Sequence, residues 1–247
     1  MARLVLGTNK TVAVPVIAKE IEKLPALGLL RAKDANGKLI PSTTESQIMD
    51  FTGVTDVDAY MLAYAYYNNT EISGAVDFDS LTTVSGSYAC ANMFYHCTGL
   101  TRVNLSSLTT LSGGNACYSM FAYCTGLTSI DLSSLATISG NVACSSMFYH
   151  CTGLTSVDLS SLTTVSGNNA CSGMFNACTS LSTVYIGGIT AIDFGTRTNQ
   201  FTSIFSGCTQ NIDVYAPAAS QSTIEAMSGY PNFGGTGTVT WHWNTAE

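Results

Sequence analysis

The segment LTSIDLSSLATISGNVACSSMFYHCTG, residues 127–153, decides the fold because it recurs almost unchanged on both sides of itself. Its neighbours are LTRVNLSSLTTLSGGNACYSMFAYCTG at residues 100–126 and LTSVDLSSLTTVSGNNACSGMFNACTS at residues 154–180. A weaker copy begins at Ser73, and a slightly longer fifth copy runs over 181–210. A unit of this length cannot bury its own apolar face, so units of this period stack on one another. The sequence therefore predicts a solenoid of five rungs over residues 73–210.

Within one unit, alternation of apolar and polar residues predicts a short strand over LTSIDL and a second extended piece around Leu135 and Ile138. The apolar spacing then becomes helical between Ala143 and Cys151, which predicts two turns of helix in every rung. The fold class predicted is thus an α/β solenoid of about five rungs, each of roughly 27–30 residues. The predicted inward set of a central rung is Leu100, Val103, Leu105, Leu108, Leu111, Ala116, Cys117, Met120, Phe121 and Cys124.

Both ends of the array differ from the repeat and predict caps. Residues 56–72 align with the end of the repeat helix, Ala63 with Cys90 and Tyr67 with Phe94, which predicts a helical N-terminal cap. Residues 211–247 form the predicted C-terminal cap, where NIDVYAP begins as a sixth strand and GTVTWHW alternates like another. Residues 1–55 predict a small β-rich attachment segment with strands RLVLG and TVAVPVI, a brief helix or turn at AKEIEKL, and a hairpin at Asn36-Gly37.

The charges divide the chain into two parts. Residues 1–38 carry seven basic and three acidic side chains, a net +4, while residues 39–247 carry two basic and thirteen acidic, a net −11. The overall net charge of −7 disfavours nucleic acid as a partner, and no apolar stretch has the ~20 residues of a membrane span. The basic segment suits docking onto another protein or onto the acidic array of a second copy. A loosely attached small cap is the alternative.

Nine cysteines recur in two sets seven positions apart. Residues seven apart on a helix are separated by ~10.5 Å of rise, too far for one metal ion or a disulfide. Bridges between equivalent cysteines of neighbouring rungs are geometrically conceivable, but helices pack more widely than strands, and the odd number of cysteines leaves one thiol over. Free buried thiols that act as small apolar residues are favoured, with partial oxidation as the alternative.

Nothing in the sequence predicts an enzyme, a cofactor or a metal centre. Two of the three histidines, His96 and His150, are repeat equivalents, whereas an active site needs one asymmetric group of residues. Phosphate-binding loops and catalytic elbow motifs are not found in the sequence.

Two surface ladders are candidate sites. On the strand face, Asp77, Asp131 and Asp158 occupy one equivalent position, with Asn104 between them and Tyr185 in place of the acid in the fifth rung. Opposed carboxylates repel, so these residues are a candidate cation ladder; carboxylates bonded to nearby serine amides are the alternative. On the predicted helix face, the exposed residues differ from one rung to the next, whereas the core residues are nearly the same in every rung. The candidate partner-binding residues are Tyr95, His96, Tyr123, Tyr149, His150 and Tyr185, with Arg197 in the longer loop of the fifth rung. Partial packing between helices explains the helix-face residues equally well.

The phrase MFAYCTGLTSIDLSSL, residues 120–135, and its repeats resemble the BspA-type bacterial leucine-rich repeat over roughly residues 60–230. The shared features are the Met-Phe pair, the cysteine before a two-residue turn and the LTSIDL strand. This resemblance implies a right-handed leucine-rich-repeat superhelix used in extracellular binding, found on bacterial surface proteins, on some parasites and in phage particles. The period of the repeat exceeds the commoner family lengths, and residues 1–55 have no counterpart in the repeat.

The leading functional hypothesis is a non-enzymatic adhesion module of a phage virion, such as a tail or head fibre tip, located on the virion surface or extracellularly. Its expected partner is a protein or glycan on a host cell or mucosal surface, with other virion proteins held by the N-terminal segment; homo-oligomers are a further hypothesis. The N-terminus lacks the features of a secretory signal, which motivates the virion version. The alternatives are a BspA-like adhesin on a bacterial cell surface and a structural virion spacer that binds nothing.

Overall fold

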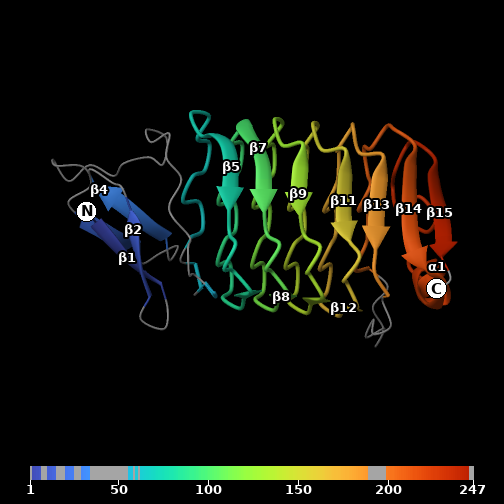
Figure 1. The fold of residues 1–247 in the computed structure, drawn as a ribbon, viewed down its shortest axis with the longest axis horizontal. Coiled ribbons are helices and arrows are strands. Elements are labelled where there is room, and N and C mark those ends of the chain that lie inside the picture. The colour runs from blue at the N-terminus through green and yellow to red at the C-terminus, as the bar shows by residue number, and fades with distance from the viewer. Residues whose placement is uncertain are drawn as a thin grey trace.

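Each LTSIDL-type segment forms one strand of a seven-stranded parallel sheet, and the strands lie side by side in chain order (Figure 1). The computed structural model describes residues 2–6, 10–14, 20–24, 29–33, 55–57, 59–60, 62–188 and 199–244. Register pairs join equivalent residues of neighbouring rungs, such as Val103 with Ile130. The strands are β5 (Ser73–Asp77), β7 (Gly99–Asn104), β9 (Ser129–Asp131), β11 (Ser156–Leu159), β13 (Thr183–Ile186), β14 (Ile212–Pro217) and β15 (Val239–Asn244). The predicted solenoid is confirmed, with about six rungs.

A second, shorter parallel sheet follows the other extended piece of each unit. Its strands are β6 (Thr83–Val84), β8 (Thr110–Leu111), β10 (Thr137–Ile138) and β12 (Thr164–Val165). The second residue of each strand is buried and the first is half-buried. This pattern agrees with the predicted inward position of Ile138, and the short sheet flanks the core in the four rungs that contribute a strand to it.

The helices predicted in each rung are absent from the described residues, and a ribbon of consecutive β-turns stands in their place. This turn ribbon comprises residues 59–60 and 62–71 in the first circuit, then 87–96, 114–123, 141–150, 168–177 and 200–207. In one rung, φ is positive at Asn115 (54°), Ser119 (50°) and Tyr123 (62°), every fourth residue. An α-helix needs negative φ throughout. The helical expectation is therefore wrong for the rungs, and also for the cap segment, where Tyr60, Tyr64 and Asn68 have positive φ.

The hydrogen bonds of the turn ribbon explain why it replaces a helix. Alternate N–H groups donate to the next rung, as Cys117 does to the Ala143 carbonyl at 2.7 Å and Phe121 to the Met147 carbonyl at 2.9 Å. The N–H groups between them close turns within the ribbon, as Met120 does with the Cys117 carbonyl at 3.2 Å. A helix would satisfy its donors internally and offer none to the neighbouring rung. The ribbon thus continues the sheet-like ladder around the rung.

The core consists of residues that recur at the same position of every rung. All ten residues of the predicted inward set are buried, which confirms that prediction. A column of phenylalanine rings runs through the array, with centroid distances of 5.4 Å between Phe94 and Phe121 and 5.7 Å between Phe121 and Phe148. The rings are within a few degrees of parallel, so each rung packs its ring face against the next.

The cysteines form two buried columns. Column A contains Cys90, Cys117, Cys144 and Cys171, and column B contains Cys97, Cys124, Cys151, Cys178 and Cys208. In column B each thiol donates to a carbonyl of the preceding rung, as Cys124 Sγ does to Phe94 O and Cys151 Sγ to Phe121 O, both at 3.1 Å. The predicted burial of the thiols is confirmed, and in column B the S–H group also serves as a link between rungs.

A column of glycines lines the corner between the short strand and the turn ribbon. A Cβ atom on Gly113 would lie 2.3 Å from the Gly86 carbonyl oxygen, and one on Gly140 would lie 2.2 Å from the Gly113 oxygen. Gly114, the next residue along, has only distant neighbours, the nearest atom at 3.9 Å. The backbones of successive rungs therefore approach so closely at this corner that only hydrogen fits.

The N-terminal segment contains two antiparallel strand pairs in its described parts. Strand β1 (Ala2–Leu6) pairs with β2 (Lys10–Val14), as the sequence predicted for RLVLG and TVAVPVI. The brief helix or turn predicted at AKEIEKL is wrong, because β3 (Glu20–Leu24) is a strand that pairs with β4 (Leu29–Lys33). The hairpin predicted at Asn36-Gly37 lies outside the described residues.

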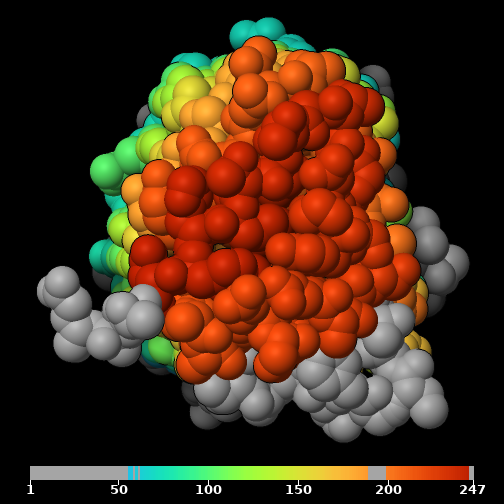
Figure 2. All heavy atoms as spheres, turned by 90° about the vertical axis from the view of Figure 1, so that its right-hand side faces the viewer, coloured from blue at the N-terminus to red at the C-terminus, as the bar shows by residue number. Residues whose placement is uncertain are grey.

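The C-terminal segment adds two strands to the sheet and closes its end. The strands predicted from NIDVYAP and GTVTWHW are β14 and β15, which pair with each other in parallel. Between them lie the 3-10 helix η1 (Ala218–Ser220) and the short helix α1 (Gln221–Glu225). Figure 2, which views this end along the array, shows residues coloured orange to red covering the face. Ile224, Met227 and Phe233 from this segment are buried.

The repeat register predicts that a whole rung can be removed. Deletion of residues 127–153 should leave a soluble protein that unfolds in one cooperative step, because Gly126 then joins Leu154 at the same position of the repeat. Size-exclusion chromatography and a thermal melt followed by circular dichroism would measure this. Deletion of residues 127–139, about half a rung, should instead aggregate, because it breaks the register of every column. Aggregation of the whole-rung deletion would contradict the solenoid register.

Candidate functional site

The candidate aromatic residues gather on the turn ribbon of the first rungs. We call Tyr64, Tyr67, Tyr95, His96, Tyr123, Tyr149 and His150 the aromatic patch. Ring centroids are 4.8 Å apart between Tyr67 and Tyr95, 5.2 Å between Tyr95 and Tyr123, and 5.1 Å between Tyr123 and Tyr149. The structure thus brings five of the predicted residues together into one continuous surface that crosses several rungs.

The tyrosine hydroxyls of the aromatic patch interact with one another. A hydrogen bond to Tyr149, together with partial burial, raises the pKa of Tyr123 to about 12. Burial is the main cause that raises the pKa of Tyr95, with a further contribution from Tyr67. With raised pKa values, Tyr95 and Tyr123 stay neutral at physiological pH, and they present ring edges and hydroxyl groups rather than charge.

The aromatic patch is confined to part of the array. Tyr149 and His150 correspond to Asn176 and Ala177 in the following rung, and those correspond to Ser206 and Gly207 in the rung after that. The buried columns continue through these later rungs unchanged, since Phe175, Phe205, Cys178 and Cys208 are all buried. The fold therefore does not require aromatic residues at these positions, and their presence in the first rungs calls for another explanation.

Two residues of the aromatic patch were missed by the sequence reasoning. The predicted alignment of Tyr67 with Phe94 is wrong by one residue, because Tyr66 stacks on Phe94 at 5.1 Å and Tyr67 stacks on the exposed side at Tyr95. Equivalent residues are 28 positions apart between the first circuit and the next rung, as in Tyr66 and Phe94, but 27 apart between the two rungs that follow, as in Phe94 and Phe121. An alignment at a constant 27-residue period therefore places Tyr67 in the core. Tyr66 is buried whereas Tyr64 and Tyr67 are exposed, which fits the corrected alignment.

A second candidate surface lies on the outer face of the seven-stranded sheet. Register pairing places one residue from each strand in a single row, which we call the sheet row: Asp77, Asn104, Asp131, Asp158, Tyr185, Tyr215 and His242. The prediction that Tyr185 takes the position of the acids is confirmed, so Tyr185 lies on this face rather than in the aromatic patch. Arg197 lies outside the described residues.

Two carboxylates of the sheet row, Asp131 and Asp158, are engaged with the turn that follows their strand, whereas Asp77 accepts a hydrogen bond from the Asn104 side chain of the next strand. Oδ1 of Asp131 accepts from the Ser133 N–H at 3.1 Å and from its hydroxyl at 2.7 Å, and Oδ1 of Asp158 accepts from the Ser160 N–H at 2.8 Å. This is the alternative that the sequence left open beside a bound cation. Among the described residues no group of three metal-ligating side chains gathers. The cation ladder stays a prediction, while the turn-capping role is observed.

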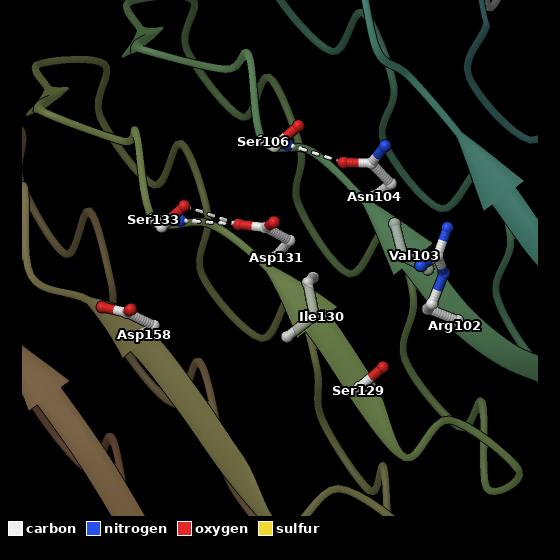
Figure 3. Close-up of a pocket in the computed structure, with 9 residues that line it drawn as sticks. All are labelled: Arg102, Val103, Asn104, Ser106, Ser129, Ile130, Asp131, Ser133 and Asp158. Carbon is white, nitrogen blue, oxygen red and sulfur yellow. Dashed lines mark hydrogen bonds between the residues drawn. The ribbon is translucent and has the colours of Figure 1, made fainter.

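The polar half of the sheet row borders a shallow depression of about 470 Å³ (Figure 3). Arg102 lies at one side of it with its guanidinium 3.9 Å from the Asp77 carboxylate. In the aromatic half, Tyr185, Tyr215 and His242 stack with centroid distances of 5.3 and 4.6 Å. His242 Nε2 also lies 2.9 Å from Asp213 Oδ1. The three rings stack on one another, and Tyr185 is 44% exposed, so this half of the row is a second exposed aromatic surface.

No protein-family model and no curated protein matches the chain. Solved structures are similar to it, among them the two that follow. A leucine-rich repeat protein of T. pallidum shares 20% identity over 66% of this chain and 64% of that one, with a TM-score of 0.37. A leucine-rich cell surface protein from Faecalibacterium prausnitzii A2-165 shares 16% identity over 92% of this chain and 40% of that one, with a TM-score of 0.35. The chain spans less than two thirds of either. In its described part, none of the helices is long and apolar enough to cross a membrane.

Proposed function

We propose that this protein is a non-enzymatic adhesion module whose aromatic patch contacts a protein or glycan on a cell or mucosal surface. The observation that carries the proposal is the confinement of the patch to the first rungs of a scaffold that tolerates Asn, Ala, Ser and Gly at the same positions. Tyrosine is enriched at binding interfaces because its ring is rigid and apolar while its hydroxyl forms hydrogen bonds. The resemblance of the repeat to the BspA type, which implies extracellular binding, supports the same function.

The finer proposal is that the module belongs to a phage virion, as part of a tail or head fibre, with the N-terminal segment as its attachment to the particle. The charge contrast between residues 1–38, at +4, and the rest of the chain, at −11, supports a separate docking role for that segment. A bacterial surface adhesin of the BspA-like kind uses the same binding surface and differs only in its carrier.

The binding proposal predicts a loss of adhesion when the patch is replaced by residues that the scaffold already accepts. The variant Tyr95→Asn, His96→Ala, Tyr149→Asn, His150→Ala copies the residues of the fourth rung. It should bind at least about tenfold more weakly to a mucin-coated surface, since aromatic anchors dominate interface energies. Biolayer interferometry with immobilised gastric mucin would measure the dissociation constant.

Tyr185→Thr is the matched control, because Tyr185 is an exposed tyrosine on the sheet face, outside the patch. It should bind mucin as the unaltered protein does. Equal binding by the patch variant would remove the patch as the contact surface, and failure of the unaltered protein to bind mucin would contradict mucosal adhesion.

The carrier is tested by peptide mass spectrometry of density-purified phage particles and of washed cell envelopes from the source culture. Recovery in fixed ratio to capsid and tail proteins is the result expected of a virion protein. Recovery only from the envelope would overturn the virion proposal in favour of the bacterial adhesin.

A further inference from the structure

Because each rung contains a turn ribbon rather than a helix, equivalent cysteines of neighbouring rungs lie closer together than the sequence predicted. Packed helices would hold them at helix spacing, whereas the ribbon joins successive rungs through backbone hydrogen bonds, 2.7 Å from Cys117 N to Ala143 O and 2.9 Å from Cys144 N to Ala170 O. Backbones joined in this way lie roughly 4.8 Å apart. That spacing falls within the Cα separations of about 4.4–6.8 Å that a disulfide spans.

The sulfur atoms of column A face one another across the rungs. Cys144 Sγ lies 3.4 Å from Cys171 Sγ. Cys90 and Cys117 occupy the equivalent positions of the repeat two rungs earlier, and both are buried. A disulfide needs a sulfur separation of about 2.05 Å, so closing the Cys144 pair shortens the contact by roughly 1.4 Å. Side-chain rotation alone provides a movement of that size, and the hydrogen-bonded backbones do not have to separate.

The column B thiols contact backbone oxygen, whereas Cys144 Sγ in column A contacts both the Ala170 carbonyl, at 3.0 Å, and Cys171 Sγ. Cys151 Sγ and Cys178 Sγ each donate to a phenylalanine carbonyl of the preceding rung at 3.1 Å. Cys208 Sγ does the same toward Phe175 O at 3.2 Å. These thiols are directed at backbone oxygen, and forming a disulfide would cost each of them its link to the preceding rung.

We propose that column A is a cross-linking site at which two disulfides form, Cys90 with Cys117 and Cys144 with Cys171, while column B stays reduced. The oxidant is a small disulfide such as glutathione disulfide. The thiolate of one cysteine attacks it, forms a mixed disulfide and releases one glutathione thiolate. The thiolate of the partner cysteine then displaces the second glutathione. For each protein disulfide, two protein thiols lose two electrons and two protons, and the glutathione disulfide takes these up to become two molecules of reduced glutathione.

The cross-links form while the chain folds, before the rungs enclose the thiols. All four column A cysteines are at most 2% exposed in the folded protein, which keeps a glutathione-sized molecule away from them. Once formed, each disulfide closes a loop of one rung and prevents two rungs from separating. The cross-links therefore stabilise the array in an oxidising environment without changing its surface.

The test is to refold the reduced full chain in a glutathione redox buffer, denature it and alkylate it with N-ethylmaleimide without reduction. Of nine cysteines, four should be bonded and five alkylated, which intact mass measures directly. Peptide mapping should locate the bonds at Cys90–Cys117 and Cys144–Cys171. The refolded protein should also melt on the order of 10 °C higher than the reduced protein. Nine alkylated cysteines, or bonds that involve column B, would overturn the proposal.

Two variants separate the columns. Cys178→Ala removes a column B thiol, so eight cysteines minus four bonded should leave four alkylated. Cys171→Ala removes a column A thiol, so eight minus two bonded should leave six alkylated, with the remaining bond at Cys90–Cys117. Equal numbers of alkylated cysteines in the two variants would contradict the assignment of the disulfides to column A. If either variant fails to fold, peptide mapping of the disulfides in the unaltered protein tests the assignment by itself.

Discussion

Gly113→Ala should destabilise the protein by at least about 3 kcal/mol, although it adds a single methyl group. The added Cβ would lie 2.3 Å from the Gly86 carbonyl oxygen, an approach that forces two rungs apart at a point where both are backbone. Overpacking that cannot be relieved by a side chain costs at the upper end of the usual range of about 1–3 kcal/mol or more. Denaturation in urea, followed by circular dichroism, would measure the change in free energy of unfolding.

The adjacent glycine provides the control. Gly114→Ala places a Cβ no closer than 3.9 Å to any neighbouring atom and should change the free energy of unfolding by less than about 0.5 kcal/mol. Gly140→Ala, with its Cβ 2.2 Å from the Gly113 oxygen, should repeat the large effect one rung further along. Similar stabilities for the Gly113 and Gly114 variants would show that the rungs do not approach as closely as described.

Raising the pH from 8 to 10 should lower the free energy of unfolding of the reduced protein by on the order of 7 kcal/mol through its buried thiols. Burial raises the pKa of Cys97 to about 12 and of Cys208 to about 11, and it also raises the pKa values of Cys124, Cys151 and Cys178. The neighbouring thiols of Cys117 and Cys171, together with burial, raise the pKa values of Cys90 and Cys144. In the unfolded chain these thiols ionise near pH 9. Each of the seven thiols then contributes about 1 kcal/mol over this interval, which gives the expected total.

The sign follows from proton binding. Between pH 9 and about 11 the unfolded chain has released thiol protons that the folded chain still holds, so the stabilisation is complete below pH 9 and is lost as the pH rises. Urea unfolding at pH 8, 9 and 10 in the presence of a phosphine reductant would measure it. The double variant Cys97→Ala, Cys208→Ala should lose about 2 kcal/mol less over the same range, because two of the seven thiols are gone. A free energy of unfolding that is constant from pH 8 to 10 would contradict the prediction.

The sequence was sufficient to predict the solenoid because the repeat makes every core position visible several times. Leu100, Leu127 and Leu154 occupy the same position of three successive repeats. Each recurring apolar position forms one column of the core, so few folds other than a solenoid fit the sequence. The helix was predicted wrongly because apolar residues four apart fit both a helix and a ribbon of four-residue turns. The distinguishing signal is Asn or Gly at some of the positions four apart, such as Asn92, Asn115 and Gly173, because these residues tolerate positive φ.

The candidate surfaces were predictable to different degrees. The capping of serine amides by Asp131 and Asp158 could be anticipated, because a serine follows each acid two residues later and such spacing favours the turn. The membership of Tyr64 and Tyr67 in the aromatic patch could not, because one extra residue in the first circuit shifts the alignment from the core to the surface. Periodicity predicts a residue's environment only where the period is constant.

The turn ribbon also determines how the array begins to form. Its non-glycine residues at positive φ, such as Tyr88, Val142 and His150, each adopt a conformation that costs roughly 1 kcal/mol or more in isolation. A lone ribbon has no neighbour to accept its alternate N–H groups, so it bears this conformational energy without compensation. Two adjacent rungs are the smallest unit that offsets it, and each later rung adds to a template already in place. We therefore expect the array to nucleate with two rungs and to elongate from them, as a helix does from its first turn.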